Sequence, residues 1–139
     1  MRQRLVIDTN VLVSGLLNPK SHPGLALRRA VDRHKVLVSE ASLWELANVL
    51  SRPKLIRYVT PRESQDFIRQ LGAVAEMVPI LRPVHVCRDP HDDKILEVAV
   101  NGSADGIITG DADLLALHPF CGIRIVIPAR WLEDHAGSE

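Results

Sequence analysis

Short apolar runs alternate with helical patterns along this chain, which predicts an α/β fold with a central, mostly parallel sheet of about five strands. The runs are continuous rather than alternating in polarity, as expected of strands that helices cover on both faces. The 139 residues suit one domain with one sizeable core. We therefore expect a single-domain three-layer α/β/α sandwich over residues 1–139, with its core at about 4–132 and a short tail at 133–139.

Four runs are predicted as strands, and a fifth segment is either irregular or a short strand. The strands are RLVID (4–8), KVLVS (35–39), DGIITG (105–110) and IRIVI (123–127), and the fifth segment is MVPILRPVHV (77–86). Helical patterns occupy the intervals between them. They cover 10–17, 21–34, 42–52, a segment that opens at 60, 89–102, 111–117 and 128–135.

Capping residues mark the starts of several of these helices. Ser42 is a plausible N-cap with Glu45 at the third position, and Thr60 with Glu63 forms a second capping box. Asp89 precedes a proline at the start of helix 89–102. The positions expected to face the core are Leu43, Leu46, Ala47 and Leu50 in one helix, and Phe67, Ile68, Leu71 and Val74 in the next.

Composition and charge exclude some classes of protein. The formal net charge is zero, so the overall basic character typical of nucleic-acid-binding proteins is absent. Basic residues still gather at 28–35 and 52–62, as solvated surface or as contacts to a nucleic-acid backbone. No window of ~18 residues is free of charge, and Asp8 interrupts the apolar N-terminal stretch, so we expect no membrane span and no export. Cys87 and Cys121 form no C-x-x-C pair, which makes a reduced, cytoplasmic setting the default expectation.

Carboxylates from four segments are expected to meet at one edge of the sheet. Asp8 closes the first strand, and Asp111 and Asp113 follow the strand at 105–110. Glu45 lies off the apolar stripe in the first turn after the strand at 35–39. The pair at 92–93 lies in the first turn of helix 89–102. Because function in open parallel sheets collects beyond the carboxyl ends of the strands, these acids form the candidate site.

Each acid also has a purely structural interpretation. Asp8 and either Asp111 or Asp113 could cap helices, and Glu45 could complete a capping box. A helix has only one N-cap, however, so capping cannot explain both members of the pair at 92–93. Mutual repulsion of gathered carboxylates would destabilise the fold unless a cation neutralises it. Mg²⁺ or Mn²⁺, which prefers carboxylate oxygen and often bridges to phosphate, is the expected cation.

Other kinds of site have weaker support in the sequence. The histidines are scattered without H-x-x-x-H or H-E-x-x-H spacing, so zinc is not expected. No glycine-rich phosphate loop ends in G-K-[ST], and no serine lies in a G-x-S-x-G elbow.

Four stretches together resemble the PIN domain (PilT N-terminus) family, and within it the toxin components of bacterial toxin–antitoxin pairs. They are VIDTNVLVSGLL, SEASLWELANVLSRPKL, DPHDDKILEVAVNGSADGIITGDADLL and the closing PARWLE. The resemblance runs from about residue 5 to residue 132. The resemblance implies a compact α/β/α fold and a ribonuclease that depends on one or two Mg²⁺ or Mn²⁺ ions. It also implies an RNA substrate, a small antitoxin as partner and a homodimer.

The resemblance assigns roles to individual positions. Asp8 matches the first acid of the family and Glu45 the second. Asp93 matches the third best, although Asp92 could share or replace that role. Asp111 matches the fourth acid. The remaining matches are Asp113 as a frequent fifth acid, and Thr9, Asn10 and Thr109 as residues that orient ligands or the scissile phosphate.

Two rival functions remain open at this point. A haloacid-dehalogenase-like phosphatase also begins with a strand that ends in Asp, but it needs a second acid two residues later, where this chain has Asn10. A non-catalytic metal-binding or protein-interaction module would use the acids for stability alone.

Overall fold

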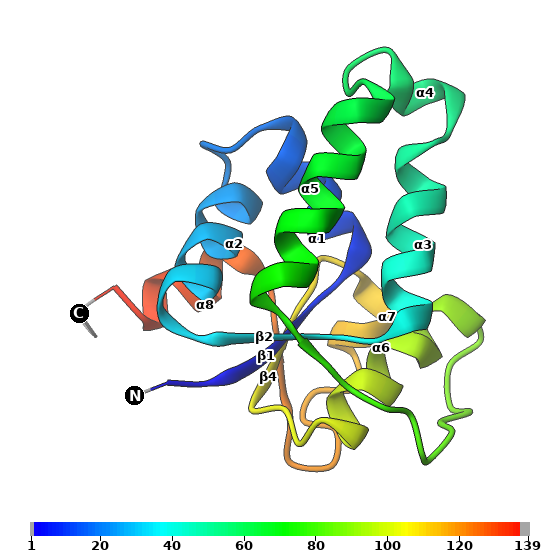
Figure 1. The fold of residues 1–139 in the computed structure, drawn as a ribbon. Coiled ribbons are helices and arrows are strands. Elements are labelled where there is room, and N and C mark those ends of the chain that lie inside the picture. The colour runs from blue at the N-terminus through cyan, green and yellow to red at the C-terminus, as the bar shows by residue number, and fades with distance from the viewer. Residues whose placement is uncertain (1, 137–139) are drawn as a thin grey trace.

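The computed structural model describes residues 2–136 and contains a parallel sheet at its centre (Figure 1). The order of its strands is β3-β2-β1-β4-β5, and every pair is parallel. The strands are β1 (Arg4–Ile7), β2 (Lys35–Val38), β3 (Glu76–Met77), β4 (Gly106–Ile108) and β5 (Arg124–Val126). The predicted α/β fold with a five-stranded parallel sheet is confirmed, and the segment at 77–86 contributes only the end of β3 before it continues as a loop.

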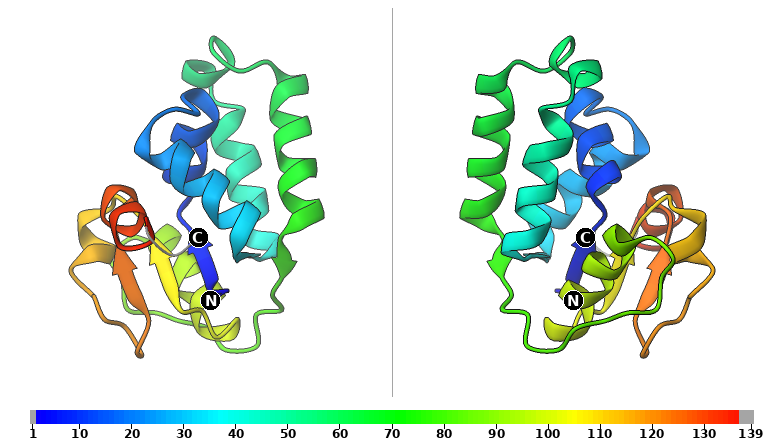
Figure 2. Two further views of the ribbon diagram at one scale, coloured as in Figure 1. Left: turned by 90° about the vertical axis from the view of Figure 1, so that its left-hand side faces the viewer. Right: turned by 90° about the vertical axis from the view of Figure 1, so that its right-hand side faces the viewer.

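Helices cover both faces of the sheet, as Figure 2 shows from two sides. One face packs against α1 (Thr9–Leu17), α2 (His22–Arg33), α3 (Glu40–Leu50), α5 (Pro61–Val74) and α8 (Pro128–Asp134). The opposite face packs against α6 (Pro90–Asn101) and α7 (Ala112–Leu115), while the short α4 (Pro53–Ile56) links α3 to α5. This is the expected three-layer arrangement. Among the described residues, no helix combines the length and apolarity needed to cross a bilayer.

Alternate residues of each strand supply the two halves of the core. Leu5 and Ile7 of β1 face the larger helical layer, whereas Val6 between them faces α6. All three are almost fully buried, which is why the strands appear as continuous apolar runs in the sequence. Two positions predicted to face the core are exposed instead, Ala47 of α3 and Val74 at the end of α5.

The helix starts agree with the sequence at α5 and α6 but differ at α3. Thr60 and Glu63 form the predicted capping box, and Asp89 caps α6. At α3 the predicted cap is wrong, because the N-cap is Ser39 and its reciprocal partner is Ser42. The Ser39 hydroxyl accepts from the Ser42 N–H at 3.0 Å, and the Ser42 hydroxyl accepts from the Ser39 N–H at 2.9 Å. Glu45 therefore takes no part in capping.

A long loop between β3 and α6 is held against α6 by three side chains of that helix. Asn101 accepts from the backbone N–H groups of residues 81 and 82, and Glu97 accepts from that of residue 84. Asp93 accepts from Val86 and Cys87 at 3.0 and 2.9 Å. These bonds satisfy loop N–H groups that no strand pairs.

The strand order also fixes where a site should lie. From β1 the chain crosses to β2 on one side, and the later strand β4 pairs on the other side of β1. Such a switch point opens a crevice beyond the carboxyl ends of the two strands. Asp8 directly follows β1, and Asp111 lies three residues after the end of β4 at Ile108.

Candidate active site

A pocket of about 180 Å³ lies at this crevice. Its lining comes from the end of β1, the start of α1, α3 with the corner that follows it, the first turn of α6 and the segment after β4. The lining residues are Asp8, Thr9, Asn10, Glu45, Val49, Arg52, Asp89, His91, Asp92 and Asp111. Half of them are acids, so the convergence of carboxylates expected from the sequence is present in the fold.

Hydrogen bonds between the ends of β1 and β4 hold Asp8 in place. Its backbone N–H donates to the carbonyl of Ile108 at 3.0 Å, which extends the pairing of the strands by one residue. The hydroxyl of Thr109, a fully buried residue, donates to Asp8 Oδ2 at 2.7 Å. The same hydroxyl oxygen accepts from the backbone N–H of Asp111 at 3.0 Å. One threonine therefore fixes two of the predicted acids relative to each other.

Glu45 reaches the pocket from the second turn of α3. Although it lies off the main apolar stripe of its helix, it is buried, because it faces the start of α1 and the start of α6. Thr9 Oγ1 donates to Glu45 Oε2 at 3.1 Å. The other carboxylate oxygen contacts Nδ1 of His91. Both oxygens of Glu45 thus have partners that orient them.

Asp92 and Asp93 have different surroundings although they are adjacent. Asp92 is buried, lines the pocket and lies beside Asp111. Asp93 points about 100° away around the helix, where it holds the loop N–H groups of Val86 and Cys87. The preference for Asp93 as the third acid of the site is therefore not supported by its position, since the structure brings Asp92 to the pocket instead.

The charges in the pocket are poorly compensated by the protein itself. Burial, with repulsion from Asp111 and Glu45, raises the pKa of Asp8 above its usual range, although the hydrogen bond from Thr109 opposes this. Burial and then the close approach of Asp111 raise the pKa of Asp92 to about 7. Hydrogen bonds from the backbone of Cys87 and Val86 have the opposite effect on Asp93, and lower its pKa.

The donor set fits a hard divalent cation. Asp92, Asp111 and Asp113 each offer a carboxylate oxygen, and these oxygens lie within 4.8 Å of one another. Asp113 follows the Asp111 cap of α7, where its N–H donates to Asp111 Oδ1 at 2.8 Å. Oxygen ligands with net negative charge are what Mg²⁺ and Mn²⁺ prefer. A bound cation would also remove the repulsion that raises the pKa of Asp92.

Comparison with known proteins agrees with this geometry. The family model for the PIN domain matches residues 4–113, which include all the pocket carboxylates. The chain belongs to the PIN domain family. A relative in Methanocaldococcus jannaschii, itself described only as uncharacterized, is 36% identical over 118 residues that cover 82% of this chain and 74% of the relative. A solved structure, VapBC2 from Rickettsia felis bound to a DNA fragment from its promoter, contains a similar chain. That chain aligns with a TM-score of 0.61 and 12% identity over 88% of this chain and 96% of its own length, which shows a shared fold.

Most predicted site residues of this PIN domain lie at or beside the pocket. Asp8, Thr9, Asn10, Glu45, Asp92 and Asp111 line it, Thr109 lies beneath it, and Asp113 adjoins Asp92 and Asp111. Asp93 alone is directed elsewhere.

Four residues of the pocket lining were not among the predicted site residues, namely Val49, Arg52, Asp89 and His91, although Arg52 belongs to the basic group at 52–62 that the sequence offered as nucleic-acid contacts. A signal existed for Arg52, which lies seven residues after Glu45 and therefore near the same helical face. His91 lies between the cap Asp89 and Asp92 in the first turn of α6. It belongs to no H-x-x-x-H or H-E-x-x-H motif, so the sequence does not mark it.

Proposed function

We propose that this PIN domain is a divalent-metal-dependent endoribonuclease that hydrolyses RNA phosphodiester bonds. The observation that carries the proposal is the meeting of Asp8, Asp92 and Asp111 from three separate elements in one small pocket. Two of these carboxyls, those of Asp8 and Asp92, have raised pKa values because the protein buries them beside other acids and forms no ion pair with either among the described residues. A metal ion bound in the pocket would relieve this repulsion and stabilise the folded state.

In this proposal Asp8, Asp92 and Asp111 hold one Mg²⁺ or Mn²⁺, and Glu45 and Asp113 bind a second ion or act through water. When bound, the metal lowers the pKa of a water molecule and stabilises charge on the scissile phosphate. Thr109 orients Asp8 through its hydrogen bond, and Thr9 does the same for Glu45. Asn10 is exposed in the pocket lining and is assigned to the substrate phosphate.

The biological setting of the proposal is a toxin–antitoxin pair in the cytoplasm. Its support is the resemblance of the sequence to toxins of this family and the fold shared with a chain of the VapBC2 complex. We propose a small antitoxin as partner and a homodimer as the assembly. A small neighbouring reading frame with a DNA-binding motif would support the toxin assignment.

Two other functions are less compatible with the pocket. A haloacid-dehalogenase-like phosphatase needs an acid at the position of Asn10, which lines the pocket as an amide. Stable phosphorylation of Asp8 would favour that function over the nuclease. A purely structural metal site does not require a pocket beside the acids. It also predicts that RNA is not cleaved at any metal concentration.

The decisive experiment compares Asp8→Asn with the unchanged protein on defined RNAs, with Mg²⁺, with Mn²⁺ and with chelator. We expect Asp8→Asn to keep the fold and to lose cleavage by at least about 1,000-fold, because an amide cannot supply the charge that a hard cation requires. Asp66→Asn is the matched control, since Asp66 is partly exposed on α5, pairs with Arg69 and does not line the pocket. Full activity of purified Asp8→Asn protein would refute the proposal.

A further inference from the structure

One cationic side chain, Arg52, shares the lining of the acidic pocket. Glu45, Val49 and Arg52 all line it. Their i, i+4, i+7 spacing places them on one face of α3 and the turn that continues it. Arg52 therefore lies about 10 Å farther along the helix axis than Glu45, at 1.5 Å per residue. The helical face that brings Glu45 to the carboxylates also brings a guanidinium group to the pocket.

The backbone of Arg52 is held firmly at the corner between α3 and α4. Its N–H donates to the carbonyl of Val49 at 3.2 Å, and its carbonyl accepts from Leu55 and Ile56 at 2.8 and 3.2 Å. Pro53 follows and favours the extended conformation that Arg52 adopts as N-cap of α4. These contacts fix the position of Arg52 without any use of its side chain.

The guanidinium of Arg52 has no carboxylate partner in the part of the chain that the structure describes, although five acids line the same pocket. Asp8 is bound by Thr109, and Glu45 by Thr9 and His91. Arg4 and Arg124 at the other end of the sheet, by contrast, both pair with acids. Among the described residues, therefore, no ion pair accounts for the positive charge that Arg52 brings to the pocket.

A polyanionic substrate needs a cation at this place. If one RNA phosphate approaches Asp8, Asp92 and Asp111 through a metal ion, the next phosphate along the strand lies by the acidic wall that includes Glu45 and would be repelled. A guanidinium offers two parallel N–H donors that match two phosphate oxygens. The pocket of about 180 Å³ is below the range of roughly 300–1,000 Å³ typical of small-molecule sites, so it suits a backbone segment better than a whole nucleotide.

We propose that Arg52 binds the phosphate next to the scissile one in single-stranded RNA and positions the strand across the carboxylates, irrespective of base sequence. This inference rests on the proposed function and names the part of the substrate that the site recognises. It also gives Arg52 a role that the other basic residues at 52–62 do not share, although all of them are close together in the sequence. Arg57, for example, is exposed at the end of α4 and does not line the pocket.

The test measures binding of two short single-stranded RNAs of unrelated sequence to Asp8→Asn protein, by fluorescence anisotropy over a range of salt concentrations. Adding Arg52→Gln should weaken both RNAs by about tenfold, as expected for loss of a charge-assisted hydrogen bond. It should also reduce the slope of log K against log salt by about 0.7, the value for one single-strand phosphate contact. Arg52→Lys should keep the slope and recover only part of the affinity, because lysine lacks the planar fork.

Arg57→Gln is the matched control, with the same change of charge on the same corner, and we expect a clearly smaller loss. Equal losses for Arg52→Gln and Arg57→Gln would reduce the effect to general surface charge and overturn the proposal. So would unchanged binding after Arg52→Gln, loss for only one of the two RNAs, or no RNA binding by the Asp8→Asn protein. Cleavage by the unchanged protein is assayed separately, so failure of the nuclease assignment is distinguishable from failure of this contact.

Discussion

Acidic side chains at the two ends of the parallel strands, where the strands begin and where they end, have opposite electrostatic surroundings. At the edge where the strands begin, Arg4 binds both carboxylate oxygens of Glu76 at 3.0 and 2.7 Å, and Arg124 pairs with Asp134. The arginines lower the pKa values of Glu76 and Asp134. At the edge where the strands end, the pKa values of Asp8 and Asp92 are raised. The fold thus pairs Glu76 and Asp134 with arginines where the strands begin, whereas Asp8 and Asp92 have no ion pair among the described residues where the strands end.

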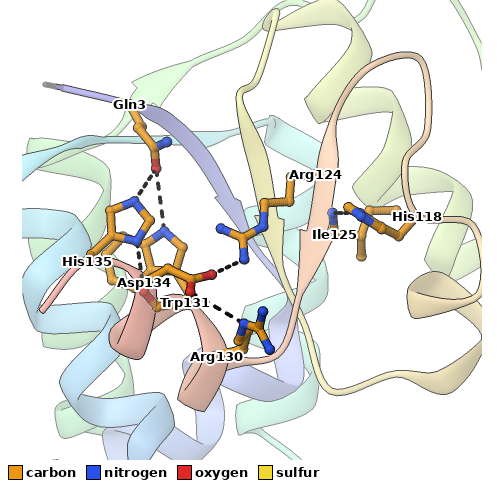
Figure 3. A network of polar contacts seen from close by, with 8 residues as sticks. All are labelled: Gln3, His118, Arg124, Ile125, Arg130, Trp131, Asp134 and His135. Atoms are coloured by element: carbon orange, nitrogen blue, oxygen red, sulfur yellow. Dashed lines mark hydrogen bonds and ion pairs between the residues drawn. The ribbon is translucent and has the colours of Figure 1, made fainter.

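Figure 3 shows the network of polar contacts around Arg124 and Asp134. Gln3 Oε1 lies 3.1 Å from Nε2 of His135, whose ring stacks on Trp131 with ring centroids 4.5 Å apart. His118 Nδ1 accepts from the backbone of Ile125 at 2.9 Å. The polar groups in this network have partners within the fold. Asp8 and Asp92 at the opposite ends of the strands have no ion pair among the described residues, which supports the cation of the proposed function.

The largest effect expected from this contrast is on catalysis by the adjacent acids of α6. Asp92→Asn should lower the rate of RNA cleavage by at least about 100-fold, because Asp92 lies in the pocket and its carboxylate is proposed to bind the metal ion. Asp93→Asn should change the rate by less than about threefold and should instead loosen the loop held at Val86 and Cys87. Single-turnover kinetics and hydrogen exchange of the loop measure the two effects. A larger loss of cleavage rate for Asp93→Asn than for Asp92→Asn would instead identify Asp93 as the third acid of the site.

The next effect concerns metal binding and thermal stability. Mn²⁺ at about 100 times its Kd should raise the Tm by roughly 5–10 °C, because a ligand that binds only the folded state stabilises it by about 2.7 kcal/mol. Asp92→Asn should remove most of this rise, whereas Glu76→Gln at the opposite edge should leave it unchanged. Differential scanning calorimetry with and without Mn²⁺ makes the comparison. An equal rise in the Asp92→Asn protein would place the ion elsewhere.

A smaller effect is the dependence of stability on pH without metal. The pKa of Asp92 is raised to about 7 in the folded protein, so the folded state holds this proton more tightly than the unfolded chain does. Below the pKa of the unfolded chain, about 3.8, Asp92 costs no stability. As pH rises from there to about 7 its ionisation destabilises the fold. Urea unfolding of metal-free protein across this range should show a steeper loss for the unchanged protein than for Asp92→Asn. Parallel pH curves for the two proteins would contradict this.

The smallest effect is expected at the matched edge. Glu76→Gln removes a partly exposed ion pair with Arg4, and such pairs contribute little to stability. The Tm should fall by no more than a few degrees, and RNA cleavage should not change. A large loss of activity after Glu76→Gln would mean that the two edges are not independent.

Local patterns in the sequence predicted much of the fold. Buried strands such as β1 appear as continuous apolar runs, and the Thr60–Glu63 capping box depends only on neighbouring residues. The cap of α3 was mispredicted because Ser39 and Ser42 both carry suitable hydroxyls. Only the place where β2 ends decides which of them begins the helix.

The sequence predicted which acids gather near the candidate site, but it did not settle which of their side chains face the pocket. Asp92 and Asp93 share one helical turn. Asp93 faces the loop that precedes the helix and accepts from Val86 and Cys87, which leaves Asp92 to face the pocket. The contribution of Arg52 likewise depends on how the corner after α3 folds toward strand ends that are far away in sequence. Such information is carried by tertiary contacts.

The hydrogen bond from Thr109 to Asp8 joins residues separated by 101 positions in the chain. Asp92 and Asp111 also come from the later part of the sequence, and β4, which pairs with β1 and places Thr109, lies between them in the chain. A ribosome that has synthesised the first two strands has therefore made only one of the pocket's acids, Asp8. The centre is completed only near the end of translation, and a truncated chain that stops before β4 lacks both Thr109 and Asp111.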